Sequence, residues 1–402
     1  MRSDLADKTI GERIRTLRGK LLTQQQLADM AQVSVALIRK LEQGRRHTAS
    51  IGSLQRIARA LDVDIAVLVG KRGSLPPSSP DEGVTAIRRA LTPVDDLLGE
   101  DLATGEPLGI DEARRTVEYC WGTYWSGHYE ALGSLLPAAL EQLRATTHAV
   151  ESDQCVEAHE LLARGYWVTG CTLVHLGQQD SAFLSIRHAL TAAELGGDPF
   201  LAATLRGSVA WQLLVQGRFD ESARIALRAA STLEPHGDVS PPHLSCYGSL
   251  VITAATAAGR NQRVGQAREL LGEADAVARR IGTDRNDYET AFGPSQVTMQ
   301  TVDVHVVTEH YPEALKEAKD MPRDNGLPLA SRARHLADRA FAHARLGHDE
   351  KALQAVLTAE SMAPDWIKHQ ALPRQVVAEL VERERRVTTP LRTLARRLGV
   401  TV

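Results

Sequence analysis

The 402-residue sequence has few aromatic residues, and Phe, Trp and Tyr together make up 4% of it. Strands are enriched in aromatic and β-branched residues, whereas Ala and Leu, which are abundant here, favour helices. This composition argues against a β-sandwich. Hydrophobic residues nevertheless make up 43% of the chain, which is enough for a large core and excludes a chain that is disordered overall. We therefore expect an all-α protein.

Cysteine is also scarce, and the four residues are dispersed at Cys120, Cys155, Cys171 and Cys246. None forms a CxxC pair or a Cys/His arrangement with metal-ligand spacing, so we expect reduced core thiols and no metal site. The zinc-protease pattern that begins at His159 fails, because Ala163 stands where a second His is required. The sequence also lacks a phosphate-binding or dinucleotide-binding loop. We expect no enzymatic activity and no cofactor.

Long hydrophobic runs are missing as well. No stretch of 18 apolar residues occurs, and the charged N-terminal segment MRSDLADK does not resemble a signal peptide. These absences predict a cytoplasmic protein without a membrane partner. The net charge is only −3, but residues 1–72 contain 14 Lys and Arg against 7 Asp and Glu, so the remainder is acidic. A basic head on an acidic body points to an anion-binding head.

Composition also divides the chain into parts. Residues 68–83, LVGKRGSLPPSSPDEG, contain too much Gly, Pro and Ser for a helix and are typical of a linker. We expect a head domain at 1–72, a linker with a connecting helix at 73–109, and a body of amphipathic helices at 110–402. Within the body, QVTMQTVDVHVV resembles a strand in isolation, but its helical neighbours favour a helix at 297–307.

The head carries clear signals for helix starts and stops. Thr23 and Gln26 form a capping box, and Ser34 is a favourable N-cap for the helix SVALIRKLEQ. Gly44 stands where a left-handed residue commonly ends a helix. Apolar residues at helical spacing predict two further helices, at 10–17 and 52–61.

The block 9–69 resembles the Cro/CI (Xre) helix-turn-helix family over its full length. The matching residues are Ile10 to Arg15, Thr23, Gln24, Gln26, Leu27, Ala28, Val33, Ser34, Ile38, Leu41, Glu42, Gly44, Arg45, Leu54, Ile57, Ala58, Ala60 and Leu61. So many matches in register are highly specific. The resemblance implies a five-helix bundle whose third helix enters the major groove of double-stranded DNA.

Helical spacing assigns faces to that third helix. Ile38 and Leu41 form an apolar pair that must point into the bundle, which leaves Val35, Ala36 and Arg39 outside. Val35 and Ala36 could contact thymine methyl groups and Arg39 could bind guanine, while basic residues near the helix ends could bind phosphates. The alternative is an ordinary solvated surface. The candidate DNA contacts are Arg15, Gln24, Ser34, Val35, Ala36, Arg39, Lys40, Arg45 and Arg46.

The body is internally repetitive. Similar turn segments recur around Gly127, Gly177, Gly217, Gly259, Glu309 and Gly347. A small residue lies near several of these turns, such as Ala182 after Gly177 and Ala352 after Gly347. Over residues 110–365 the pattern resembles a degenerate tetratricopeptide repeat array, which implies stacked helical hairpins with a concave surface.

Counting back from the turns places four of the five Trp on the concave face of this array. With nearby Arg, Tyr and His, they could form a recognition pocket; the alternative is that they fill the core. The candidate ligand-binding residues are Arg114, Trp121, Tyr124, Trp125, Arg164, Trp167, His175 and Trp211. The fusion also resembles Gram-positive peptide-sensing regulators, but the Asn residues that clamp peptides in that family have no counterparts at the expected inner positions.

The sequence thus predicts a transcriptional regulator that binds operator DNA through its head. A homodimer is expected, because one small head contacts few base pairs. A small-molecule or peptide effector at the concave face would modulate DNA binding. The alternative is a non-catalytic protein-interaction scaffold whose helix-turn-helix domain serves assembly.

Overall fold

The structure is a computed structural model that describes residues 8–19, 22–46, 49, 51–61, 63, 68, 82–93, 105–322, 325–384 and 388–401. The expected all-α architecture is confirmed: these residues form helices joined by turns, and an isolated bridge between Arg285 and Phe292 is the β-type pairing among them. Most of the expected linker at 68–83 lies outside the described residues.

The head consists of α1 (Ile10–Arg18), α2 (Gln24–Met30), α3 (Val35–Glu42) and α4 (Ile51–Ala60). The capping box at Thr23 and the Ser34 cap are confirmed, and Gly44 has a φ of 67° just after α3. Ile14, Leu27, Ile38, Leu41 and Ile57 form the centre of a separate small core. The fifth helix implied by the family resemblance falls on residues that are mostly outside the described part.

A connecting helix, α6 (Glu82–Leu91), precedes the body and packs on its second helix. The two helices approach closely where Gly83 faces Gly133, because a Cβ on Gly83 would lie 3.1 Å from the Gly133 Cα. Ile87 and Leu91 are fully buried on this side. The connecting helix is thus part of the body's core.

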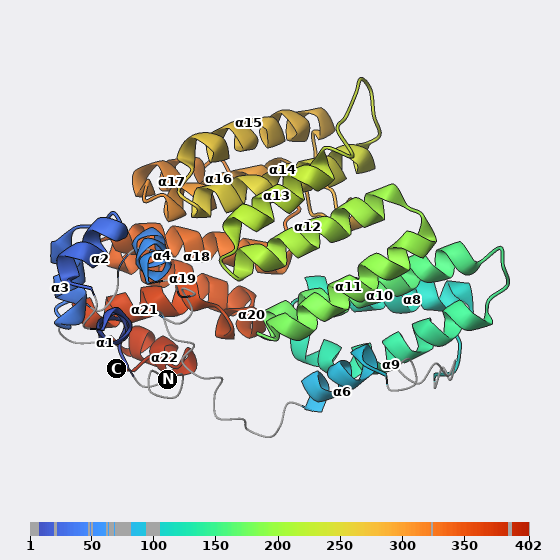
Figure 1. The fold of residues 1–402 in the computed structure, drawn as a ribbon, viewed down its shortest axis with the longest axis horizontal. Coiled ribbons are helices and arrows are strands. Elements are labelled where there is room, and N and C mark those ends of the chain that lie inside the picture. The colour runs from blue at the N-terminus through green and yellow to red at the C-terminus, as the bar shows by residue number, and fades with distance from the viewer. Residues whose placement is uncertain are drawn as a thin grey trace.

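Six helical hairpins follow within the described residues (Figure 1). They are α8 (Ile110–Trp125) with α9 (Tyr129–Ala149), α10 (Cys155–His175) with α11 (Gln179–Gly196), α12 (Pro199–Val215) with α13 (Phe219–Ala230), α14 (Pro241–Arg260) with α15 (Val264–Ile281), α16 (Pro294–Val307) with α17 (Tyr311–Glu317), and α18 (Leu329–Arg345) with α19 (Asp349–Met362). The last helices are α20 (Pro364–Lys368), α21 (Ala371–Arg383) and α22 (Thr389–Arg397). The segment 297–307 is helical, as expected.

The six hairpins share one turn geometry. Two residues after the end of each first helix lies a left-handed residue with φ between 62° and 80°. The N–H of the next residue donates to the carbonyl five positions earlier, as from Arg218 to Leu213 at 2.9 Å, which satisfies a carbonyl at the helix end. The left-handed residues are Gly127, Gly177, Gly217, Gln262, Glu309 and Gly347.

The fourth turn differs from the sequence expectation, which centred it on Gly259. The left-handed residue is Gln262, and Gly259 lies inside α14. A Cβ on Gly259 would come within 3.0 Å of Val304 Cγ2, so this glycine permits close packing of α14 on α16.

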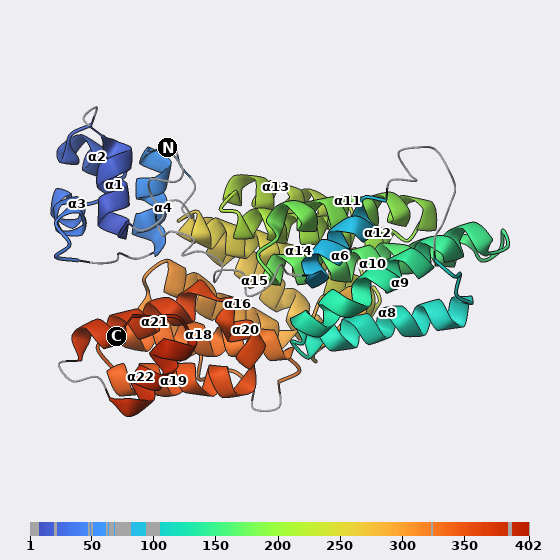
Figure 2. The same ribbon diagram turned by 90° about the horizontal axis from the view of Figure 1, so that it is seen from below.

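The body does not remain an open array, because its last hairpin contacts its first. A Cβ on Gly127, in the first turn, would lie 3.6 Å from Cδ2 of Leu329 at the start of α18. One hydrophobic cluster contains residues from α8 and α10 together with residues from α16, α18 and α21. Both views show α20 beside the ends of the first hairpins (Figures 1 and 2). The repeats therefore curl until their two ends meet.

Candidate DNA-binding surface and inner surface of the repeats

Except at Val35, which was expected on the outer face, the exposed and buried faces of α3 are those expected from its spacing. Ile38 and Leu41 are 0% and 1% exposed, whereas Ala36, Arg39 and Lys40 are exposed to solvent. Val35 is half-buried and packs against the core of the head. The outer face of α3 thus presents a small apolar residue and two cations, a combination that can contact base edges and phosphates.

A buried ion pair locks the three helices around this face. Arg18 in α1 donates to both Glu42 carboxylate oxygens at 2.7 and 2.9 Å, and Gln24 in α2 donates to the same carboxylate at 2.7 Å. Burial alone would raise the pKa of Glu42, but the hydrogen bonds from Arg18 and Gln24 outweigh it and hold the pKa below its ordinary value. This network fixes α3 relative to α1 and α2.

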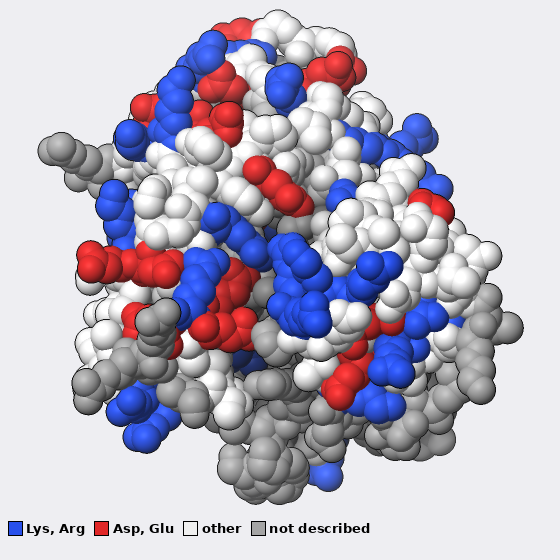
Figure 3. Space-filling view, turned by 90° about the vertical axis from the view of Figure 1, so that its left-hand side faces the viewer, with Lys and Arg blue, Asp and Glu red and all other residues white. Residues whose placement is uncertain are grey.

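The remaining predicted DNA contacts differ in their local roles. Arg15, Arg45 and Arg46 are exposed, and the Arg46 N–H donates to the Lys40 carbonyl, which closes the loop after α3. Ser34 caps α3 by accepting from the Leu37 N–H. On the face of the molecule that carries the head, Lys and Arg side chains are numerous, with Asp and Glu among them (Figure 3).

Within the described residues, a hydrogen bond joins the head to the repeats. Arg59 in α4 donates to Asn261 Oδ1 at 2.6 Å, and Asn261 in turn donates to Asp220 at 2.9 Å. Asn261 belongs to the fourth repeat turn, so the head lies against the turn side of the fourth hairpin.

Six of the predicted ligand-binding residues form a single aromatic cluster. Trp121 packs edge-on against Trp167, with ring centroids 5.0 Å apart, and stacks on Trp125 at 5.9 Å. The ring of His175 lies 3.1 Å from the Tyr124 hydroxyl and 5.8 Å from the centroid of Trp211. The cluster therefore brings together α8, α10 and α12.

The cluster is packed rather than open, which corrects the expectation of an accessible aromatic pocket. Trp121 and Trp167 are only 4% and 3% exposed, and Tyr124 is 7% exposed. These residues share a hydrophobic cluster with α16 and α18, because the curled repeats cover the inner face. Trp125, His175 and Trp211 are partly exposed.

The two predicted arginines lie away from the stacked rings. Arg114 forms ion pairs with Asp111 and Glu157 at the start of α8. The guanidinium of Arg164 lies 5.4 Å above the ring of Tyr288, a residue of the α15–α16 loop. Sequence reasoning missed Tyr288, since a loop residue distant in sequence carries no local signal of this contact.

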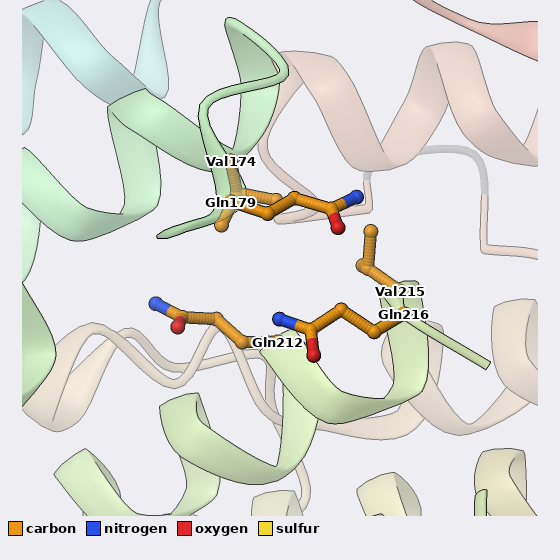
Figure 4. A pocket seen from close by; sticks show the side chains of 5 residues that line it. All are labelled: Val174, Gln179, Gln212, Val215 and Gln216. Atoms are coloured by element: carbon orange, nitrogen blue, oxygen red, sulfur yellow. The ribbon is translucent and has the colours of Figure 1, made fainter. Parts of the chain in front are cut away.

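Small hollows lie in the first three hairpins. One, which is too shallow to hold a water molecule, is lined by Val174, Gln179, Gln212, Val215 and Gln216 (Figure 4). Another, of about 190 Å³, lies between α8 and α9 beside Tyr119 and Gln142. Both are below the roughly 300–1,000 Å³ of small-molecule sites.

Charged residues occupy the inner helices of the later hairpins. Asp303 in α16 accepts from Arg260 in α14 and from Arg334 in α18, both at 2.7 Å, and Arg334 also pairs with Asp338 at 3.1 Å. Burial raises the pKa of Asp338, and Arg334 only partly offsets this effect. For Asp303 burial acts in the same direction, but the two arginines outweigh it and lower its pKa.

Among the described residues, no three His, Cys, Asp or Glu side chains are arranged to hold a metal ion. Cys120, Cys171 and Cys246 are buried free thiols, and Cys155 is a half-buried one. Across the same residues no helix combines the length and apolar composition that a membrane span needs.

Comparisons with known proteins agree with the geometry of the head. The helix-turn-helix family model matches residues 14–68. No curated protein matches the chain. Among solved structures, PilF of Pseudomonas aeruginosa is similar at 17% identity over 66% of this chain and 99% of that chain, with a TM-score of 0.34. The chain joins a Cro/CI-type helix-turn-helix domain to a tetratricopeptide-like α-solenoid.

Proposed function

We propose that this chain is a cytoplasmic transcriptional regulator that binds specific operator DNA through α3. The observation that carries the proposal is the two-faced character of α3, whose Ile38 and Leu41 are buried while Ala36, Arg39 and Lys40 are exposed. A helix of this kind fits the major groove with its first turns against base edges. The family match of residues 14–68 supports the same role.

The exposed side chains divide into two kinds of DNA contact. Arg39 projects from the middle of α3 and binds a guanine edge, while Val35 and Ala36 contact thymine methyl groups. Arg15, Arg45 and Arg46 bind phosphates, and Lys40 adds charge beside them. Gln24 and Ser34 act mainly by position, because their side chains hold Glu42 and the start of α3.

The regulator acts as a homodimer, since a single α3 covers one half-site and two half-sites raise both affinity and specificity. The helical-repeat body carries the response to an effector. Its partly exposed inner residues Trp125, Arg164, His175 and Trp211 contact that effector, whereas the buried Trp121 and Trp167 support them. Arg114 lies near the start of α8, where it pairs with Asp111 and Glu157, and is not part of this site.

The test is selection of DNA from a random duplex library, followed by binding across a salt series. The wild-type chain is expected to enrich one sequence and to bind it with a steep salt dependence. Arg39→Ala should lose about 1–3 kcal/mol and relax the preference at one base pair. Arg45→Ala should weaken all sequences alike and lower the salt slope by about one.

Arg228→Ala, at an exposed position on α13, is the matched control and should bind as the wild type does. If the wild-type chain binds selected and random duplexes equally, the protein does not read sequence. The scaffold alternative would then replace the regulator.

A further inference from the structure

The loop between α15 and α16, residues 283–293, crosses to residues of the first three hairpins. At its tip, the short helix η2 (Asp287–Glu289) presents Tyr288 and Glu289. The Tyr288 hydroxyl donates to Asp198 Oδ2 at 2.8 Å, and its ring lies below the Arg164 guanidinium. The indole N–H of Trp125 donates to the Glu289 carboxylate. The tip therefore contacts α8, α10 and the start of α12.

The base of this loop is firmly anchored. Phe292 is fully buried and packs on Gly248, where a Cβ would come within 2.1 Å of the Phe292 ring. The Arg285 N–H donates to the Phe292 carbonyl at 2.9 Å, and Asp284 accepts from the Ser295 N–H at 2.9 Å. The base of the loop is thus held by contacts that do not involve Tyr288 or Glu289.

The tip, in contrast, has an unfavourable backbone. Tyr288, Glu289 and Ala291 have φ values of 48°, 55° and 48°, in the left-handed region that residues with a Cβ rarely adopt. Such conformations persist only where surrounding contacts impose them, and they cluster at ligand clamps and switch regions. The contacts around the tip include a phenol on a carboxylate, a cation over a ring and a carboxylate on an indole N–H, and the Tyr288 ring also packs near Phe200.

We propose that Tyr288 and Glu289 are a built-in stand-in for the effector, and that they occupy its binding site until the effector displaces them. The groups they engage define the effector's chemistry. A ring fits below Arg164, a hydroxyl donor on that ring meets Asp198, and a carboxylate accepts from Trp125. The effector class is a hydroxyaryl carboxylate, either a free small molecule or the adjacent side chains of a peptide. This inference rests on the proposed function of the inner surface.

Displacement would free groups at the edge of the aromatic cluster. With the tip in place, the indole N–H of Trp125 donates to Glu289 and its ring is only partly exposed, while Trp121 and Trp167 pack with α16 and α18. Withdrawal of the tip would uncover Trp125, Arg164 and Asp198 together. The effector competes with a tethered group. Its apparent association constant is therefore the intrinsic one multiplied by the fraction of molecules in which the tip is withdrawn.

The experiment measures calorimetric binding of two probes to the full chain. The probes are acetyl-Tyr-Glu-amide and 3-(4-hydroxyphenyl)propionate, which represent the peptide and the small-molecule source. The double variant Tyr288→Gly, Glu289→Gly removes both side chains and relieves the backbone strain. We expect it to bind at least one probe about tenfold or more tightly than the wild type. Adding Trp125→Phe and Arg164→Gln should abolish that gain.

Two further variants keep the result interpretable. Glu289→Gln retains the shape of the tip but weakens its acceptor, and it should give a smaller gain in probe affinity. It replaces the double variant if circular dichroism shows that the double variant is unfolded. Asp238→Gly, in the exposed loop after α13, is the control for an added glycine and should bind as the wild type does. The inference is overturned if folded tip variants bind both probes no better than the wild type.

DNA binding by the same preparations separates the two proposals. Selective DNA binding without any gain in probe affinity refutes the stand-in and leaves the regulator intact. A gain in probe affinity without DNA binding would support the site and refute the regulator.

Discussion

A histidine in the aromatic cluster, which is only partly exposed, makes the stability of the body sensitive to acid. His175 stacks on Tyr129 with ring centroids 4.4 Å apart and is also bordered by Tyr124 and Trp211. Burial, helped by the nearby His369, lowers the pKa of His175 to about 4 from an ordinary 6.5. The unfolded chain therefore binds a proton more readily than the folded one between these values. The stability that depends on neutral His175 is therefore fully present above about pH 6.5 and is lost as the pH falls toward 4.

His175→Gln should remove the share of this pH dependence that His175 contributes. Between pH 7 and pH 5 the wild type should lose about 2 kcal/mol of unfolding free energy more than the variant, because about 1.4 kcal/mol corresponds to each unit of differential protonation. Urea unfolding at the two pH values measures the difference. His236→Gln, at an exposed position, should keep the wild-type loss. Equal losses in wild type and His175→Gln would contradict the assignment.

Residue identities on the inner face were more predictable than their exposure. Counting back from the turns brought Trp121, Trp125, Trp167 and Trp211 to one side, and the structure gathers them there. Whether each ring meets solvent depends on α16, α18 and the 283–293 loop, which lie more than 70 residues further along the chain. The ion pair between Arg18 and Glu42 could not be predicted from local sequence either, since 24 residues separate the partners.

At the scale of elements, the six repeat turns use one backbone geometry with unequal residues. Four have glycine at the left-handed position, but Glu309 adopts a φ of 67° and Gln262 a φ of 62°. A residue with a Cβ pays about 1–2 kcal/mol in this region. Gln262 recovers part of this through a hydrogen bond from its side chain to the Val307 carbonyl at 3.0 Å, whereas Glu309 is exposed.

Glu309→Gly should therefore stabilise the protein, by about 0.5–1 kcal/mol once the added freedom of the unfolded chain is subtracted. The reciprocal change Gly347→Ala should destabilise it by about 1–2 kcal/mol, because no atom lies within 4 Å of the added Cβ and only the backbone is strained. Denaturant unfolding of both variants tests the signs. A destabilised Glu309→Gly would show that the Glu309 side chain has a stabilising contact of its own.

The helices themselves were largely predictable, because capping residues and apolar spacing are local. The fourth turn was misplaced by three residues for a physical reason. Gly259, on which the sequence centred the turn, instead permits close packing of α14 on Val304. The left-handed residue is Gln262, and a glutamine does not indicate a turn in the sequence. Glycine marks both close packing and left-handed turns, and a sequence alone does not separate the two.

For the whole molecule, the closure of the solenoid is the feature that no local pattern indicates. In an open array each repeat contacts only its neighbours, so its stability is a sum of local terms. Here Leu329 in the sixth hairpin packs on the first turn, and α21 covers α18 and α19 at the C-terminal end. The first and last hairpins should consequently be coupled, although about 200 residues separate Gly127 from Leu329.

Weakening the last hairpin should test that coupling. Phe341 in α18 is 1% exposed and packs edge-on against Tyr311, with Arg345 over its ring at 4.7 Å. Phe341→Leu should cost about 1 kcal/mol through lost packing. In the closed solenoid, hydrogen exchange should then accelerate in α18 and also in the second half of α8, which ends at Trp125 and the Gly127 turn. Leu250→Ala changes the separate hydrophobic cluster that contains α14. It should accelerate hydrogen exchange in α8 less than Phe341→Leu does. If exchange rises only in α16 to α21, the ends of the solenoid contact each other without sharing stability, and the repeats behave as an open array.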